Sequence, residues 1–256
     1  MKPKTLILRT AGTNCDAETQ HAFELAGASA DKLHLNRVLS DPSLLEDYQL
    51  LALPGGFSYG DDIAAGKILA NQIVHHLTEP LRRFIDAGKL IIGICNGFQV
   101  LVKTDLLPGA LGGASGQTAT LTHNDNGRFI CEWVRVKPIG NKCIWTQNIP
   151  ELELPIAHGE GKFIPATPGV RQALKDNGQI ALVYTNQNPN GSTDDIAGVC
   201  DASGRVFGLM PHPERFVSAQ QHPAWSSRKS PDAQGAGLAI FKNAVRYASQ
   251  AVGAGV

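Results

Sequence analysis

The sequence predicts an α/β fold: a doubly wound, mostly parallel sheet flanked by helices, with an added region of antiparallel strands. In the first hundred residues, short apolar runs alternate with helix-compatible segments, a pattern typical of parallel strands joined by helices. Between about residues 111 and 164, runs of alternating polar and apolar residues are separated by turns, which favours antiparallel strands attached to the main sheet. Nothing marks a linker, so we expect residues 1–256 to form a single domain.

The composition of the chain excludes some classes of function. The 23 Lys and Arg residues balance 23 Asp and Glu residues, so charge gives no reason to expect a nucleic-acid or anionic-membrane partner. The five cysteines are odd in number and form no C-x-x-C pair, which indicates neither a disulfide framework nor a zinc site. No stretch resembles a secretory leader or a membrane span. We therefore expect a cytoplasmic protein that acts on a small molecule.

The first half of the chain supplies alternating strands and helices. We expect strands at residues 5–10, 31–35, 48–53 and 89–94. Helices are expected at residues 17–26, 62–77 and 79–87. Asp16 can cap the first helix and Gly27 can end it. In sheets of this kind the ligand binds beyond the carboxyl ends of the strands.

The second half changes character. Its middle strands are expected at residues 118–122, 128–136 and 153–158, with later strands at 180–185 and 206–210. Residues 237–249 are expected to form a closing helix. Residues 218–236 are rich in Ser, Gln, Ala and Pro and are expected to form a surface loop.

The run Gly93-Ile94-Cys95-Asn96-Gly97 follows an apolar strand and precedes a helix-compatible segment. Small residues two before and two after the cysteine let strand and helix approach closely, so the pattern predicts a nucleophile elbow with Cys in place of Ser. At a helix N-terminus the dipole favours thiolate over thiol. A buried structural cysteine is the alternative, but the flanking glycines favour a nucleophile.

A second chemical feature is Met210-Pro211-His212-Pro213-Glu214. A residue that precedes proline is held in an extended conformation, so His212 and Glu214, two positions apart, are expected to face one side. The carboxylate can then orient the imidazole by accepting one of its N–H groups, which leaves the other nitrogen to take a proton from a thiol. His75 and His76 lack such partners in the sequence and are expected to be ordinary helix residues.

The glycines Gly55 and Gly56 follow the strand at residues 48–53. Their unobstructed backbone N–H groups are suited to a tetrahedral oxyanion, although an ordinary glycine-rich turn explains them equally well. Residues 60–67 resemble a P-loop only superficially, because Ile68 stands where Ser or Thr would bind magnesium. We therefore expect no ATP site, no other cofactor and no metal in this chain. A nucleophile, an oriented base and oxyanion donors together predict acyl transfer through a thioester, with the acyl group left open.

Several separate motifs resemble those of class I, triad-type glutamine amidotransferases. The elbow and the His-Pro-Glu step are shared across that class. The resemblance also covers Ala157-His158-Gly159-Glu160-Gly161. Three other runs narrow it to the glutaminase subunits of phosphoribosylformylglycinamidine synthase, which act in purine biosynthesis: Asn14-Cys15-Asp16 within Gly12-Thr13-Asn14-Cys15-Asp16, Gly56-Phe57-Ser58-Tyr59-Gly60-Asp61 within the run from Pro54, and Asn188-Pro189-Asn190-Gly191-Ser192.

The resemblance implies a role for each matching residue. Cys95 attacks the side-chain amide of glutamine, His212 relays the proton to the leaving ammonia, and Glu214 orients His212. Backbone N–H groups around Gly56 and Asn96 hold the oxyanion, and Gln99 helps to bind glutamine. Water then releases glutamate from the thioester.

The resemblance also implies a partner. Ammonia would pass to a separate synthetase subunit, which uses ATP and magnesium to convert formylglycinamide ribonucleotide to formylglycinamidine ribonucleotide. A small third subunit often bridges the two. Residues 218–236 depart from the shorter members of the family, which leaves the docking surface and the need for the third subunit open.

Two other classes stay open. A stand-alone cysteine hydrolase of the same fold, similar to γ-glutamyl hydrolase, would need the same triad but no partner. A catalytically idle scaffold would not need the elbow, base and carboxylate together. Cys15 has no role in this scheme, and we expect it to be structural.

Overall fold

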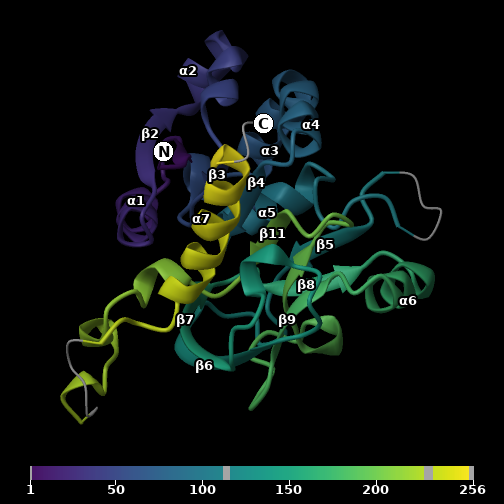
Figure 1. Cartoon of the computed structure of the whole chain (residues 1–256). Coiled ribbons are helices and arrows are strands. Elements are labelled where there is room, and N and C mark those ends of the chain that lie inside the picture. The colour runs from purple at the N-terminus through teal and green to yellow at the C-terminus, as the bar shows by residue number, and fades with distance from the viewer. Residues whose placement is uncertain (1, 112–115, 228–232, 254–256) are drawn as a thin grey trace.

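The computed structural model describes residues 2–111, 116–227 and 233–253. Its main feature is a mixed sheet in which the strands lie side by side in the order β2-β1-β3-β4-β11-β10-β9-β6-β7 (Figure 1). The strands are β1 (Lys4–Arg9), β2 (Ser29–His34), β3 (Leu50–Leu53), β4 (Leu90–Ile94), β6 (Ile130–Pro138), β7 (Leu152–His158), β9 (Ile180–Tyr184), β10 (Ile196–Cys200) and β11 (Val206–Leu209).

The sheet has a parallel half and an antiparallel half. Strands β2, β1, β3, β4 and β11 pair in parallel with their neighbours. Beyond β11, the pairs β11-β10, β10-β9, β9-β6 and β6-β7 are all antiparallel. The predicted fold class, a mostly parallel core with an added antiparallel region, is confirmed.

Helices cover the parallel half from both sides. The helices are α1 (Asp16–Leu25), α2 (Leu35–Ser40), α3 (Lys67–His76), α4 (Thr78–Asp86), α5 (Asn96–Lys103), α6 (Pro168–Asp176) and α7 (Leu238–Gly253). The chain moves from β1 to β2 in one direction along the sheet and from β3 to β4 in the other, so right-handed crossovers place α1 and α3 on opposite faces. Figure 1 shows α1 on one side of the sheet and α3 and α4 on the other. Helix α1 packs against α7, and α3 against α5.

The strands near the centre of the sheet are buried along their whole length. Every residue of β3, β4 and β11 is buried, which fits their nearly continuous apolar sequences, because helices shield both faces. None of the helices in the described ranges has both the length and the apolar character that a membrane crossing requires.

The structure corrects some expected boundaries and pairings. The helix expected from residue 62 begins at Lys67, because Gly66 has φ +70° and a left-handed residue cannot continue a right-handed helix. The strand expected at residues 118–122 does not join the main sheet: β5 (Ala119–Thr122) pairs with β8 (Lys162–Pro165) in a separate two-stranded sheet. That pairing depends on a partner that the sequence did not predict as a strand.

The segment expected as a surface loop, residues 218–236, is only partly one. Short 3-10 turns form at Ala219–Gln221 and Trp225–Ser227, and Ala219 and His222 are buried. The His222 ring lies 4.4 Å from the Trp133 ring of β6, which anchors the first part of the segment. Residues 228–232 lie outside the described residues, so the expectation is not tested there.

Candidate active site

The candidate site forms where four neighbouring parallel strands end. Strands β1, β3, β4 and β11 are adjacent in the sheet, so the turns that follow them meet at one edge. Leu53 is in register with Gly93, and Ile94 with Leu209, which brings the ends of β3, β4 and β11 level. The expectation that the turn at Gly55 and Gly56 shares an edge with Cys95 is therefore confirmed.

Cys95 lies at a strained turn between β4 and α5. Its backbone has φ 50° and ψ −105°, a conformation that a residue with a side chain rarely adopts. A Cβ atom at Gly97 would come within 1.9 Å of the Leu53 carbonyl oxygen, and one at Gly93 within 2.6 Å of the Gly97 carbonyl oxygen. The two glycines therefore permit the close strand and helix approach that the elbow pattern predicts.

His212 and Glu214 form a buried pair just beyond β11. The His212 Nδ1 atom lies 2.6 Å from Glu214 Oε1, and the two residues are 2% and 1% exposed. The backbone N–H of His212 donates to the Pro155 carbonyl oxygen at 2.8 Å, which fixes this segment against β7. The pairing of His212 with Glu214 was expected. The expected extended backbone was wrong, because Pro213–Arg215 forms a 3-10 turn. Proline presets φ for the first residue of such a turn.

The pKa of His212 is set by its burial and by two charged neighbours. Burial alone would lower the pKa of His212, but the nearby Glu214 carboxylate and Cys95 raise it, so the pKa lies well above its usual value. An ionised carboxylate only accepts hydrogen bonds, so the proton between Glu214 and His212 belongs to Nδ1. The raised pKa means that the His212 ring readily takes up a second proton, and Nε2 is the nitrogen that receives it.

Asn96 ties the loop after β3 to the elbow. Its Oδ1 accepts from the Ser58 N–H at 3.2 Å, and its Nδ2 donates to Asp61 Oδ1 and to Gln99 Oε1, each at 3.0 Å. Gln99 Nε2 in turn donates to the Glu160 carbonyl oxygen at 2.7 Å. Both polar ends of the Gln99 side chain are therefore engaged within the protein.

The glycine-rich loop after β3 lies directly against the other groups of the site. A Cβ atom at Gly55 would lie 2.7 Å from His212 Cε1 and 3.3 Å from Cys15 Sγ. Gly56 has φ +134°, and a Cβ there would come within 2.6 Å of the Asn14 backbone nitrogen. A side chain at Gly55 or Gly56 would push this loop away from the His212 ring or from the turn after β1. Only glycine therefore fits at these two positions.

Two hollows meet at Cys95. The larger, of about 220 Å³, is lined by Gly56, Phe57, Asp61, Ala65, Cys95, Gln99, Phe129, Ala157, His158, Gly159 and Glu160. The smaller, of about 140 Å³, is lined by Asn14, Cys15, Gly56, Phe57, Cys95, Phe129, Ala157, His212 and Arg215. Both lie below the roughly 300 to 1,000 Å³ typical of sites for drug-sized ligands, so the site suits a small metabolite.

Sequence reasoning assigned no role to His158, which lines the larger hollow. Its Nδ1 lies 3.1 Å from Asn124 Oδ1, which also accepts from the Gly161 N–H, while Asn124 Nδ2 donates to two carbonyl oxygens. These bonds fix the Asn124 amide and make His158 Nδ1 the donor. Burial, followed by the nearby His212, lowers the pKa of His158 to about 4.

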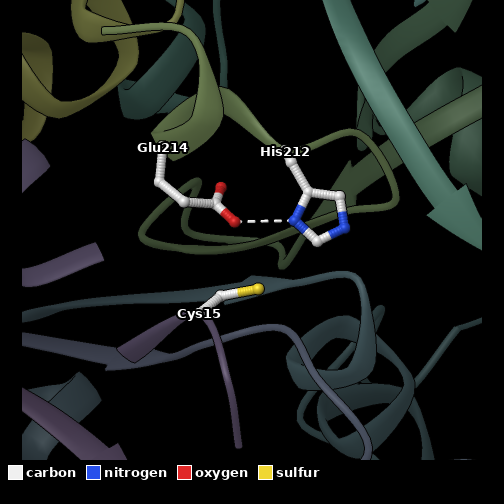
Figure 2. A group of neighbouring side chains, drawn as sticks. All are labelled: Cys15, His212 and Glu214. Carbon is white, nitrogen blue, oxygen red and sulfur yellow. Dashed lines mark hydrogen bonds and ion pairs between the residues drawn. The ribbon is translucent and has the colours of Figure 1, made fainter. Parts of the chain in front are cut away.

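Sequence reasoning also missed the position of Cys15. Its sulfur faces His212 and Glu214 from the turn after β1 (Figure 2). One ligand atom of each of these three residues lies within 4.8 Å of the others. Arg215 Nη2 donates to Cys15 Sγ at 3.1 Å. The expectation that Cys15 is structural placed it outside the site, whereas it contacts the site directly; the only sequence signal was its place in the first turn of a parallel sheet.

The chain matches the CobB/CobQ-like glutamine amidotransferase domain over residues 2–248. It belongs to that family of glutamine amidotransferases.

Similar proteins within this family carry more specific names. The chain is 50% identical over 261 residues to the phosphoribosylformylglycinamidine synthase subunit PurQ of Dehalococcoides mccartyi, covering 97% of this chain and 99% of the relative. It is 37% identical to the subunit of that name from Thermotoga maritima, covering 85% and 90%. Among solved structures, a chain of PurLQS from Thermotoga maritima superposes with a TM-score of 0.76 at 33% identity, covering 96% and 99%.

Proposed function

We propose that the chain is the glutaminase subunit of phosphoribosylformylglycinamidine synthase. The proposal rests on the arrangement of side chains in the site together with the names of the similar proteins. Cys95 at the elbow and His212, whose Nδ1 is paired with Glu214, line one hollow, and relatives named for that enzyme match nearly the whole chain. The substrate is glutamine, and the product that matters to the enzyme is ammonia.

In the proposed reaction, the Cys95 sulfur attacks the carbonyl carbon of the glutamine side-chain amide. His212 Nε2 takes the thiol proton and gives it to the departing nitrogen, so ammonia leaves and a thioester remains. Glu214 accepts from Nδ1 and keeps the imidazole in the tautomer that this transfer needs. Water then attacks the thioester, which releases glutamate and restores the thiol.

The oxyanion of the tetrahedral intermediate needs N–H donors close to Cys95. We assign this role to the backbone N–H groups of Gly56 and Asn96. Asn96 begins α5, where the first N–H groups have no intrahelical acceptor, and Gly56 lines both hollows. The oxygen and nitrogen of the Gln99 side chain are already bonded, which supports a role for Gln99 in shaping the substrate hollow.

The ammonia goes to a partner in this proposal. A synthetase subunit that carries ATP and magnesium would take it up and convert formylglycinamide ribonucleotide to formylglycinamidine ribonucleotide, with no cofactor held by this chain. Ammonia is protonated quickly in water and then no longer acts as a nucleophile, so direct transfer between subunits is required. The solved relative PurLQS, by its name an assembly of several subunits, supports this arrangement.

We place this activity in the cytoplasm. All five cysteines are free thiols, and Cys131 is exposed, which suits a reducing compartment.

The proposal is tested by trapping the thioester. The chain, reconstituted with the synthetase subunit, ATP and formylglycinamide ribonucleotide, is mixed with glutamine and quenched in acid, and a glutamyl adduct is sought by mass spectrometry. We expect the adduct on the peptide that contains Cys95, its loss in Cys95→Ser, and its retention in Cys131→Ser, in which an exposed thiol is removed. An adduct on another residue, or turnover that survives Cys95→Ser, would refute the mechanism.

A further inference from the structure

The proposed reaction leaves a buried thiol beside its base unexplained. Cys15 is 1% exposed, and one ligand atom from each of Cys15, His212 and Glu214 lies within 4.8 Å of the other two. Figure 2 shows the three side chains converging from the turn after β1 and the turn after β11. Glutamine hydrolysis needs the imidazole and the carboxylate, but it makes no use of this second sulfur.

The three donors match one class of ligand. A thiolate, an imidazole nitrogen and a carboxylate oxygen are the groups that bind zinc, and three protein ligands leave a fourth position for water. We propose that Cys15, His212 and Glu214 form a site for a thiophilic divalent cation such as Zn²⁺, and that the bound cation inhibits the enzyme. The inhibition, though not the binding, rests on the proposed glutaminase function.

A second observation concerns the same carboxylate. Glu214 Oε2 is buried and has no hydrogen-bond partner among the described residues. A buried carboxylate with an oxygen that lacks a partner is costly, and a cation held through Oε1 would offset part of that cost. The hollow lined by Cys15, Cys95, His212 and Arg215 gives a small ion a path to the cluster.

One neighbour opposes the cation. The Arg215 guanidinium donates to Cys15 Sγ through Nη2 at 3.1 Å and to Glu18 Oε2 through Nε at 3.1 Å. Binding requires the first bond to break, while the pair with Glu18 can remain. The cost of displacing Arg215 weakens binding, so the site suits a reversible inhibitor and not a permanent structural ion.

Binding would remove the catalytic base. Nδ1 is the imidazole nitrogen that lies against the Glu214 carboxylate, so it is the nitrogen that reaches a shared cation. The Cys15 thiol gives up its proton to solvent, and the single proton of the neutral imidazole moves from Nδ1 to Nε2 as the cation takes its place on Nδ1. The neutral imidazole then carries its proton on Nε2 and can no longer accept one from Cys95. The cation therefore stops the reaction without touching the nucleophile.

The binding test uses Co²⁺ as a spectroscopic probe on the purified chain, since a cobalt-thiolate bond gives a near-ultraviolet charge-transfer band. We expect the band in the unmodified chain, in Cys95→Ser and in Cys131→Ser, and its loss in Cys15→Ala. Cys15→Ser, which is closer in size, replaces the alanine variant if that variant does not fold. A band that survives loss of Cys15 but disappears in Cys95→Ser would place the metal on Cys95 and overturn the proposal, as would no band at all.

The inhibition test measures glutamate release by the reconstituted enzyme against increasing Zn²⁺, each variant being compared with its own rate without metal. Loss of a ligand should raise the half-inhibiting Zn²⁺ concentration by at least about tenfold in Cys15→Ala. Equal sensitivity of the variant and the unmodified enzyme would overturn the proposal. If the chain has no glutaminase activity, the cobalt measurement still decides whether the site exists.

Discussion

The carboxylate of Glu214 decides which nitrogen of His212 can act as a base. It holds Nδ1 at 2.6 Å in a site that is almost fully buried. In Glu214→Gln the amide oxygen can still accept from Nδ1, so the geometry is kept while the charge that supports the imidazolium is lost. We expect kcat for glutamate release to fall by about 10²- to 10⁴-fold, the range typical of losing acid-base assistance.

Steady-state kinetics of the reconstituted enzyme measure this effect. Glu24→Gln is the matched control, because Glu24 is exposed on α1 and lines neither hollow at Cys95. An unchanged kcat in Glu214→Gln would show that the charge of Glu214 does not support the imidazolium.

His158 should make stability depend on pH. Its pKa is lowered by burial to about 4, from 6.5 in the unfolded chain. Between pH 6.5 and pH 4, His158 is therefore protonated in the unfolded state but stays neutral in the folded state. The stabilising contribution is complete above pH 6.5 and is lost as the pH falls toward 4. Linkage gives a loss of about 2 kcal/mol in the free energy of unfolding between pH 7 and pH 5.

His158→Asn tests this expectation, because an asparagine amide can still donate to Asn124 but does not titrate. Urea denaturation at pH 7 and pH 5 should show a smaller loss of stability in the variant than in the unmodified chain. Parallel losses in both proteins would mean that His158 is not the group that titrates.

The three proposed catalytic side chains were predictable because their signals are local. The glycines at positions 93 and 97 mark the elbow, and His212 and Glu214 are two residues apart. The setting of His158 was not predictable, since its tautomer is fixed by Asn124, 34 residues away. Cys15 meets Arg215 across 200 residues, and only the sheet topology brings the two together.

The elbow depends on the close contact between β3 and α5. A methyl group at Gly97 would lie 1.9 Å from the Leu53 carbonyl oxygen, and backbone cannot move aside as a flexible side chain can. We expect Gly97→Ala to lose at least about 3 kcal/mol in the free energy of unfolding, as for other severe steric changes. Urea denaturation measures the change.

Gly169→Ala is the matched control in α6. There the nearest atom to the added carbon is Thr167 Oγ1 at 3.6 Å, an ordinary contact. This change should be neutral or stabilise the protein by up to about 1 kcal/mol, because alanine restricts the unfolded chain. If Gly97→Ala proved as stable as Gly169→Ala, the close approach would not be a requirement of the fold.

The elements with strong periodic or apolar patterns were predicted well, and those that depend on tertiary partners were not. Strands β3, β4 and β11 are buried apolar runs that are visible in the sequence. Strand β10 was missed because it contains Gly198, whose position allows close contact with Gly208 and Leu209 of β11. Helix α6 was also missed, although Thr167 as its cap and Pro168 in its first turn are signals of a helix start that the sequence contains.

The complete fold explains why the proposed catalytic groups, which are far apart in sequence, meet. Four adjacent parallel strands end at one edge, and each contributes one turn to the site. The parallel order follows from the alternation of strands and helices, so this edge was predictable from the sequence. The single-domain organisation stays a prediction, which a sheet with strands drawn from Lys4 to Leu209 supports.

The central claim is that the site releases ammonia for a partner and not into water. Glutamate release from glutamine by the purified chain, alone and then with the synthetase subunit, ATP and formylglycinamide ribonucleotide, tests this claim most directly, with Cys95→Ser as the control. We predict that the chain is nearly idle alone, that the complete system is active, and that the control is inactive in both. Equal turnover with and without the partner would contradict the account and identify a stand-alone hydrolase of the same fold.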